Sequence, residues 1–248
     1  MTGTLPETGG PRSARSFWLL TALTLVALAI LVSLGNWQVR RLAWKEALIA
    51  SIAERMASPP VPLAEVEKRY AETGDVDYLP ALATGTFEHD REQHFFATHE
   101  GAAGYYVYTP LRLSDGRALF VNRGFVPFDR KDPGTRREGQ VAGTVAVSGL
   151  ARNPLAAKPF SVYDNEPGEN IYYWKDLAGM TVHAGMDPEK VLPFFLDADD
   201  APNPGGLPVG GVTIVNLPNS HLQYAITWYG LAVALAGVWI AFVLRRRP

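Results

Sequence analysis

The sequence predicts a membrane protein in which two transmembrane α-helices flank a mainly β (α+β) domain. Three observations support this prediction: two long uncharged segments lie near the ends of the chain, aromatic and β-branched residues dominate the segment between them, and turn residues divide that segment into short runs. About 20 consecutive apolar residues can cross the hydrocarbon core of a bilayer. Short β-rich runs separated by turns are typical of a small barrel or a bent sheet.

The first uncharged segment, residues 16–34, follows two arginines, Arg12 and Arg15. A cleaved signal peptide has a similar basic start, but its apolar core is about 7–15 residues long and ends at a small-x-small cleavage site. This segment is longer, and its last residues match such a site poorly. We therefore interpret residues 1–15 as a cytoplasmic tail and residues 16–35 as a retained transmembrane helix.

The second uncharged segment, residues 222–244, is followed by arginines at 245–247, whereas no lysine or arginine lies between positions 191 and 222. Positive residues favour the cytoplasmic side of a membrane. We therefore expect the tail 245–248 to be cytoplasmic, or to lie in the matrix of a mitochondrion. Two spans place both termini on one side and leave residues 36–221 on the other.

The start of the chain favours a bacterial inner membrane, with the domain in the periplasm. Residues 1–15 contain Glu7 and only two arginines, unlike an Arg- and Ser-rich mitochondrial transit peptide. A mitochondrial inner membrane is the alternative location.

The chain carries a net charge of −2 and contains no cysteine. The charge argues against nucleic-acid binding, which needs a basic face. The lack of cysteine excludes disulfides, thiolate metal sites and cysteine nucleophiles.

The charge is unevenly distributed along the chain: residues 46–222 hold 15 basic and 24 acidic residues, a balance of −9. Such an acidic domain suits a basic protein partner, or it simply keeps the domain soluble.

The helix of the first span is expected to continue as a stalk, because residues 36–57 contain no glycine or proline and many good helix formers. The sequence Ser58-Pro59-Pro60 ends it. A short helix is predicted over residues 63–72, ending at Gly74, and another over residues 176–185.

The β-rich region begins beyond Asp77. Ser114-Asp115-Gly116-Arg117 is a hairpin signal between two predicted strands. Strands are predicted over residues 93–98, 105–113, 118–125, 141–150, 170–174, 191–196 and 212–216.

Small residues recur along the second span at Gly230, Ala234, Gly237 and Ala241. Such small-xxx-small steps allow two membrane helices to approach closely. We therefore expect the first span to pack against this face.

Five motifs occur in a fixed order along the chain. They are GNWQVRRLAWK at 35–45, GY and TPL within 104–111, VNRGFVP at 121–127, Trp174 with Asp176 and Met180, and NSHLQYAITWY at 219–229. Together they cover essentially the whole chain and resemble the motifs of one known family, the Surfeit-locus protein one family of cytochrome c oxidase assembly factors. The resemblance implies a non-enzymatic role in maturing a haem-copper oxidase, by holding or delivering haem a for its catalytic subunit. It implies that subunit, and haem a synthase, as partners at the lipid bilayer.

His221 is the leading candidate ligand. At helical spacing it shares one face with Tyr224, Ala225 and Trp228. A neutral imidazole there could be an axial iron ligand, with the aromatic side chains covering a flat macrocycle. Alternatively, His221 is an interfacial residue that bonds a backbone carbonyl. The resemblance, which ties the matching histidine to haem a, favours the ligand.

Trp37, Arg40, Arg41 and Trp44 follow the first span. Arginines at this depth can pair with a haem propionate, or they can hold lipid phosphates.

Arg123 is a single basic residue in an apolar strand, between Asn122 and Gly124. A buried arginine usually needs a partner, so Arg123 is expected either in a structural ion pair or in contact with a propionate or a protein partner. Asn122, Gly124 and Trp174 are assigned the same partner-or-structural role.

His89, His94 and His99 are spaced by five residues, which places successive side chains on opposite faces of a strand and argues against a shared metal site. The sequence contains none of the common hydrolase, zinc-protease or nucleotide-binding motifs. Two functions remain: a haem a chaperone, and a scaffold that holds an oxidase subunit without contacting haem.

Overall fold

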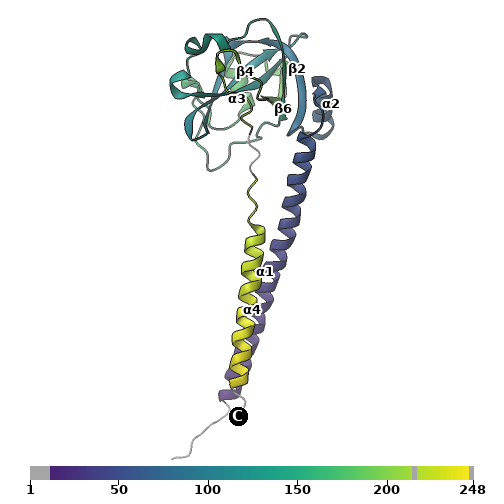
Figure 1. Cartoon of the computed structure of the whole chain (residues 1–248), viewed down its shortest axis with the longest axis vertical. Helices are drawn as coiled ribbons and strands as arrows, with labels where there is room; N and C mark the ends of the chain where they lie inside the picture. The colour runs from purple at the N-terminus through teal and green to yellow at the C-terminus, as the bar shows by residue number, and fades with distance from the viewer. Residues whose placement is uncertain (1–11, 214–216, 246–248) are drawn as a thin grey trace, which may run out of the picture. The chain divides into compact units, whose positions relative to one another are not determined.

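The computed structural model describes residues 12–213 and 217–245, which form two units (Figure 1). The first is a helix pair made of α1 (Arg12–Met56), up to residue 51, and α4 (His221–Arg245). The second is a β-sheet unit that starts at residue 52. Most of the predicted tails (1–11 and 246–248) and the end of the predicted strand 212–216 lie outside the described residues.

Both helices of the pair are long and apolar enough to cross a membrane. They include the predicted spans, and α1 continues through the predicted stalk without a break. Large apolar side chains cover their outer surfaces: Trp18 is 68 % exposed and Val233 is 73 % exposed. An apolar surface of this extent is costly in water and favourable in lipid, so the chain is a two-span membrane protein with a sheet domain.

The face of α4 that packs against α1 is not the predicted one. Ala225 and Ala232 are buried, whereas a side chain added at Gly230 or Gly237 would meet open space. The close approach is made on α1, where a Cβ on Gly35 would lie 2.6 Å from the Tyr229 ring. Polar and aromatic partners that span the two helices fix this orientation. They are Gln38 with His221, Asn36 with Tyr229, and Phe17 with Trp239.

Replacing Gly35 by isoleucine is expected to loosen the helix pair, because the new side chain collides with the Tyr229 ring. The chain lacks cysteine, so Gln38→Cys and His221→Cys can report the contact through disulfide formation. We expect Gly35→Ile to slow that reaction by about tenfold, the effect of moderate overpacking. Gly230→Ile is the matched control. Equal rates in the two variants would contradict this packing.

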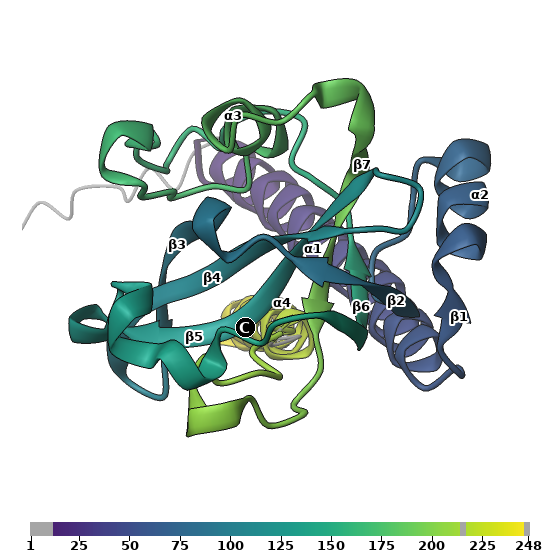
Figure 2. The same ribbon diagram turned by 90° about the horizontal axis from the view of Figure 1, so that it is seen from above.

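Seven strands form one sheet in the described residues, ordered β1-β2-β6-β7-β5-β4-β3. An additional pairing of β2 with β4 closes β2, β6, β7, β5 and β4 into a ring, as Figure 2 shows from above. Of the two predicted forms, a small barrel or a bent sheet, the structure has the closed one. β5 and β7 are parallel, as are β1 and β2, and the other pairs are antiparallel. The strands are β1 (Val61–Pro62), β2 (Leu79–Phe87), β3 (Gln93–His99), β4 (Ala102–Arg112), β5 (Ala118–Pro127), β6 (Thr144–Arg152) and β7 (Val191–Ala198).

Two helices cover the sheet, α2 (Leu63–Thr73) and α3 (Leu177–His183). Gly74 ends α2, as predicted, and the structure places it in a left-handed conformation. The Asp176 carboxylate caps α3 by accepting a hydrogen bond from the Gly179 amide at 3.0 Å. Short 3-10 turns complete the unit. They are η1 (His89–Arg91), η2 (Phe128–Arg130), η3 (Pro133–Gly139), η4 (Pro167–Glu169), η5 (Pro188–Lys190) and η6 (Pro204–Gly206).

β5 is the central element, buried on both faces. Leu119 and Val121 join a cluster formed by side chains of β2, β4, β6 and β7, with Val66 of α2. Phe120 joins a second cluster with Phe195 of β7 and Met180 of α3. Apolar burial on both faces fixes β5 and therefore fixes the polar residues at its far end.

Two strands of the sheet were not predicted, the two-residue β1 and β2. Conversely, residues 170–174 were predicted as a strand and do not form one. That segment makes an isolated bridge to β3, through hydrogen bonds from the Tyr172 amide to the His94 carbonyl and from the Phe96 amide to the Tyr172 carbonyl, each 2.8 Å. A second isolated bridge joins Ile171 to Glu166. The hairpin at 114–117 and the other predicted strands within the described residues are confirmed, except for 212–213, which form no strand.

Candidate functional site

His221, the first residue of α4, contacts Gln38 of α1. Its Nδ1 lies 2.7 Å from the Gln38 side-chain oxygen. An amide oxygen only accepts hydrogen bonds, so Nδ1 is the donor and Nε2 of the neutral ring keeps its lone pair. Metal-binding histidines commonly donate their second ring nitrogen to such an acceptor, which fixes the tautomer and the ring. The geometry leaves Nε2 without a bond to Gln38. The partner of His221 is a side-chain amide and not the backbone carbonyl of the alternative interpretation.

The neighbours of His221 on α4 divide between two environments. Ala225 is buried against α1 and Trp228 is half-buried, whereas Tyr224 is 52 % exposed. Further along α4, the Tyr229 hydroxyl donates to the Asn36 side-chain oxygen at 2.8 Å. The predicted face is therefore partly used for helix packing, and Tyr224 remains available beside it.

The predicted basic and aromatic residues of α1 lie on its exposed surface. Trp37 is 48 % and Trp44 51 % exposed, and the Arg41 guanidinium lies 4.3 Å from the centre of the Trp44 ring. Each residue of a helix turns about 100°. Arg41 therefore lies about 60° from the Gln38 direction, whereas Arg40 lies about 160° away. The structure brings Arg41 to the flank of the Gln38–His221 contact and leaves Arg40 on the opposite side.

Gln38 was quoted within a motif, but no role was predicted for it. The available signal is its spacing: it lies three residues after Gly35 and therefore on the same helix face. Gln38 is 7 % exposed. A buried polar side chain just beyond an apolar span requires a hydrogen-bonding partner.

A second group of polar residues lies in the β-sheet unit at a β-bulge of β5. Arg123 and Gly124 together face Val107 of β4, and Gly124 has a φ of 124°. The Asn122 side chain holds this bulge, since its oxygen accepts from the Gly124 amide at 3.1 Å and its nitrogen donates to Asp197 at 3.2 Å. The bulge sets the direction in which Arg123 leaves the strand.

Arg123 is 2 % exposed. Its Nη2 donates to the Gly139 carbonyl at 2.5 Å and to the Asn203 side-chain oxygen at 3.1 Å. Its Nη1 lies 3.4 Å from His89 Nδ1, and the guanidinium lies 4.7 Å from the centre of the Phe87 ring. Gly139, Asn203 and Phe87 carry no charge. His89 is also neutral, because burial and the nearby Arg123 charge lower the pKa of its ring.

The ion pair that was one of two expectations for Arg123 does not form: the ion pairs found among residues 12–213 and 217–245 do not include it. Carbonyl and amide oxygens from two loops replace the carboxylate. Burial lowers the pKa of Arg123 to about 10, so the side chain remains a cation at neutral pH.

The three spaced histidines do not meet. His89 Nε2 lies 2.9 Å from the Val141 carbonyl oxygen, and His94 lies beside Glu92. The His99 ring contacts the Phe125 ring at a tilted angle. The described residues contain no group of three or more metal-binding side chains.

Sequence reasoning also missed a buried charge cluster around Asp197. This carboxylate accepts from Thr213 Oγ1 at 2.8 Å and lies 3.6 Å from Arg152 and 3.7 Å from Lys175. Trp174, the residue before Lys175, is half-buried. Its backbone amide donates a hydrogen bond to the Asn165 side chain at 3.2 Å. These contacts give Trp174 a structural setting in the sheet unit.

Comparison with known proteins shows which family this chain resembles. The SURF1 family matches residues 25–233. Three relatives named Surfeit locus protein 1 match over most of both chains. The rat protein is 38 % identical over 87 % of this chain and 72 % of its own length, the mouse protein 36 % over 98 % and 81 %, and the human protein 35 % over 93 % and 78 %. The family names indicate an assembly factor rather than an enzyme. This chain therefore belongs to the SURF1 family, which is linked to the assembly of cytochrome c oxidase.

Proposed function

We propose that this protein binds haem a through His221 and passes it to the catalytic subunit of cytochrome c oxidase. The observation that carries the proposal is the 2.7 Å contact between His221 Nδ1 and Gln38, which leaves Nε2 available for iron. Haem is the cargo of the protein in this proposal, and the covalent chemistry of haem is left to other proteins.

The surroundings of His221 suit a flat apolar ring that carries carboxylates. Tyr224, Trp228 and Trp37 supply aromatic surface, and Arg41 supplies a guanidinium that can pair with a propionate. Arg40, on the opposite side of α1, suits a lipid phosphate better.

The proposed orientation follows from the distribution of basic residues. Arg245 closes α4, and no lysine or arginine lies between positions 191 and 222. Both termini would lie in the cytoplasm of a bacterium, or in the matrix of a mitochondrion, and His221 on the outer side. Haem a synthase would supply the cargo there, and the acidic sheet unit would contact the oxidase subunit.

The proposal predicts that the protein purified from cells that make haem a shows a haem absorption spectrum, and that His221→Ala abolishes it. Gln38→Leu removes the acceptor of the Nδ1 proton, and loss of such a partner weakens metal binding by about 10- to 100-fold. Gln38→Glu retains an acceptor and should keep the haem. The matched control is His183→Ala, which removes an exposed histidine of α3.

A colourless wild-type protein, or a haem spectrum that survives His221→Ala, would contradict haem binding at this site. The scaffold function makes a different prediction: His221→Ala would leave the haem a content of the assembled oxidase unchanged. Measurement of the oxidase spectrum in membranes of the same strains separates the two.

A further inference from the structure

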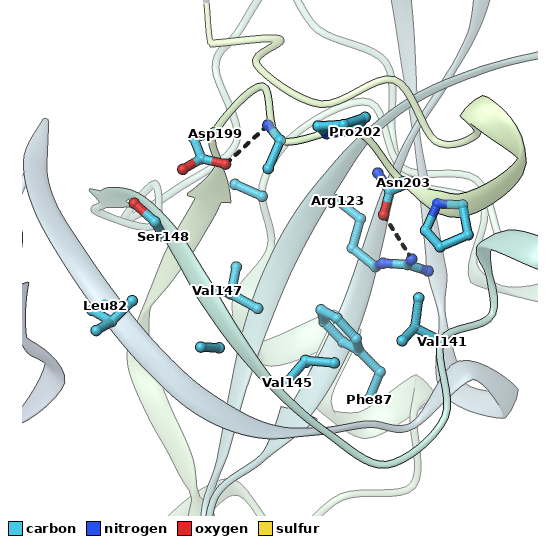
Figure 3. Close-up of a pocket in the computed structure, with 14 residues that line it drawn as sticks. Leu82, Phe87, Arg123, Val141, Val145, Val147, Ser148, Asp199, Pro202 and Asn203 are labelled. Atoms are coloured by element: carbon cyan, nitrogen blue, oxygen red, sulfur yellow. Dashed lines mark hydrogen bonds between the residues drawn. The ribbon is translucent and has the colours of Figure 1, made fainter.

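A cavity of about 290 Å³ opens beside Arg123 in the β-sheet unit. It lies between β2, β6 and the loop that follows β7 (Figure 3). Arg123 and Asn203 lie together on one side of it, and Asp199 and Ser148 lie on the other. Valines of β6 and Phe87 of β2 form the apolar wall between them.

The charges near Arg123 do not balance. Glu92 and Arg136 form a buried ion pair of their own, and both charges act on Arg123. His89, the remaining titratable group in contact with Arg123, is neutral. One buried positive charge therefore has only neutral partners among the described residues, a rare condition because buried arginines are normally paired.

We propose that this cavity binds the carboxylate of a larger molecule, with Arg123 as its charged donor and a short apolar stem against Phe87 and the β6 valines. A carboxylate is the geometric complement of a guanidinium, and it would supply the missing negative charge. The small volume suits one carboxylate-bearing group and not a whole macrocycle. Asp199 on the far side disfavours a second carboxylate at that end.

Two sources present this chemistry: the C-terminal residue of a protein, and a propionate of a porphyrin. The proposal is independent of haem binding at His221, because it concerns other residues of another unit. Failure of either proposal leaves the other unaffected.

The test uses the full chain in lipid nanodiscs and butyrate as the probe, detected by saturation-transfer NMR. Butyrate should bind, whereas butyramide and succinate should bind at least tenfold more weakly, because the first lacks the charge and the second carries a second carboxylate toward Asp199. Equal binding of butyrate and butyramide, or no binding of butyrate, would overturn the proposal.

Two variants locate the site. Arg123→Lys keeps the charge but loses the planar fork, and we expect butyrate affinity to fall about tenfold. Ala201→Phe fills the cavity from an exposed loop position and leaves Arg123 in place. It should abolish butyrate binding, and it therefore tests the cavity independently if a variant of Arg123 folds poorly. Binding that survives Ala201→Phe would overturn the assignment to this cavity.

Competition then identifies the source of the carboxylate. N-acetyl-leucine represents a protein C-terminus, and a metal-free porphyrin with propionates represents the cofactor. The compound that displaces butyrate from the wild type, and does so less well from Arg123→Lys, identifies the ligand class. Failure of both compounds would overturn the claim that the carboxylate belongs to a larger molecule.

Discussion

Replacing Gly124 by alanine is expected to destabilise the β-sheet unit severely. Gly124 has a φ of 124°, and a Cβ at this position would lie 1.9 Å from the Val209 carbonyl oxygen. The collision falls on backbone and cannot be relieved by a rotamer change. It would separate β5 from the segment at Val209, whose two hydrogen bonds with Phe125 measure 2.8 and 2.9 Å. We expect a loss of about 4 kcal/mol or more, the range of the most damaging single substitutions.

Gly143→Ala is the matched control, because Gly143 also has a positive φ (82°) but open space where its Cβ would stand. It should cost only about 1–2 kcal/mol from backbone strain. Hydrogen exchange of peptides from β5 in the intact chain measures both. Exchange should accelerate by about a thousandfold or more in Gly124→Ala and by about tenfold in Gly143→Ala. Similar rates in the two variants would contradict the collision.

The spans and the stalk could be predicted because length and lack of charge are local properties of a sequence. Which face of α4 packs against α1 could not, because the stripe from Gly230 to Ala241 satisfies the same spacing rule as the face that is used. The choice is made by Gly35 and by the partners of His221 and Tyr229, which belong to both helices. Tertiary contacts therefore decided between two equally good local patterns.

β2 escaped prediction because its buried residues are small. Ala81 and Ala83 point into the inner cluster, and a Cβ on Gly85 would lie 2.4 Å from the Arg112 carbonyl oxygen. Small residues are needed where the ring closes, yet they lower the β-propensity of the segment. The composition of β2 is therefore set by β4, a neighbour that is distant in the sequence.

The sequence identified the candidate residues but did not predict which side chains they contact. The apolar strand around Arg123 predicted that it is buried, but its neutral partners Gly139 and Asn203 come from loops 16 and 80 residues away. The histidine at position 221 was likewise identified, whereas Gln38, 183 residues away, was not. Partners so distant in sequence leave no local pattern.

Replacing Glu92 by glutamine is expected to destabilise the β-sheet unit by about 3–5 kcal/mol, because it leaves the buried Arg136 charge without its carboxylate. Glu92 is 4 % and Arg136 5 % exposed, and both oxygens of Glu92 accept from Arg136, one at 3.2 Å. Arg136 also donates to the carbonyls of Arg130 and Lys131, at 3.0 and 3.1 Å. The pair thus fastens the η2–η3 loop to the start of β3, next to the cavity at Arg123.

The pH dependence of stability tests the charge of this pair. Burial alone would raise the pKa of Glu92, but the hydrogen bonds and charges of His94 and Arg136 outweigh it and lower the pKa below 4.5. A carboxyl whose pKa is lower in the folded state stabilises the fold above its unfolded pKa and loses that contribution as the pH falls toward the folded value.

The gap in stability between wild type and Glu92→Gln, measured by hydrogen exchange of β3 peptides, should therefore be constant near neutral pH and shrink below about pH 4.5. Glu92→Gln combined with Arg136→Met, which removes both charges, should recover part of the loss at neutral pH. A gap unchanged in acid, or a double variant less stable than Glu92→Gln, would show that packing and not charge holds this loop.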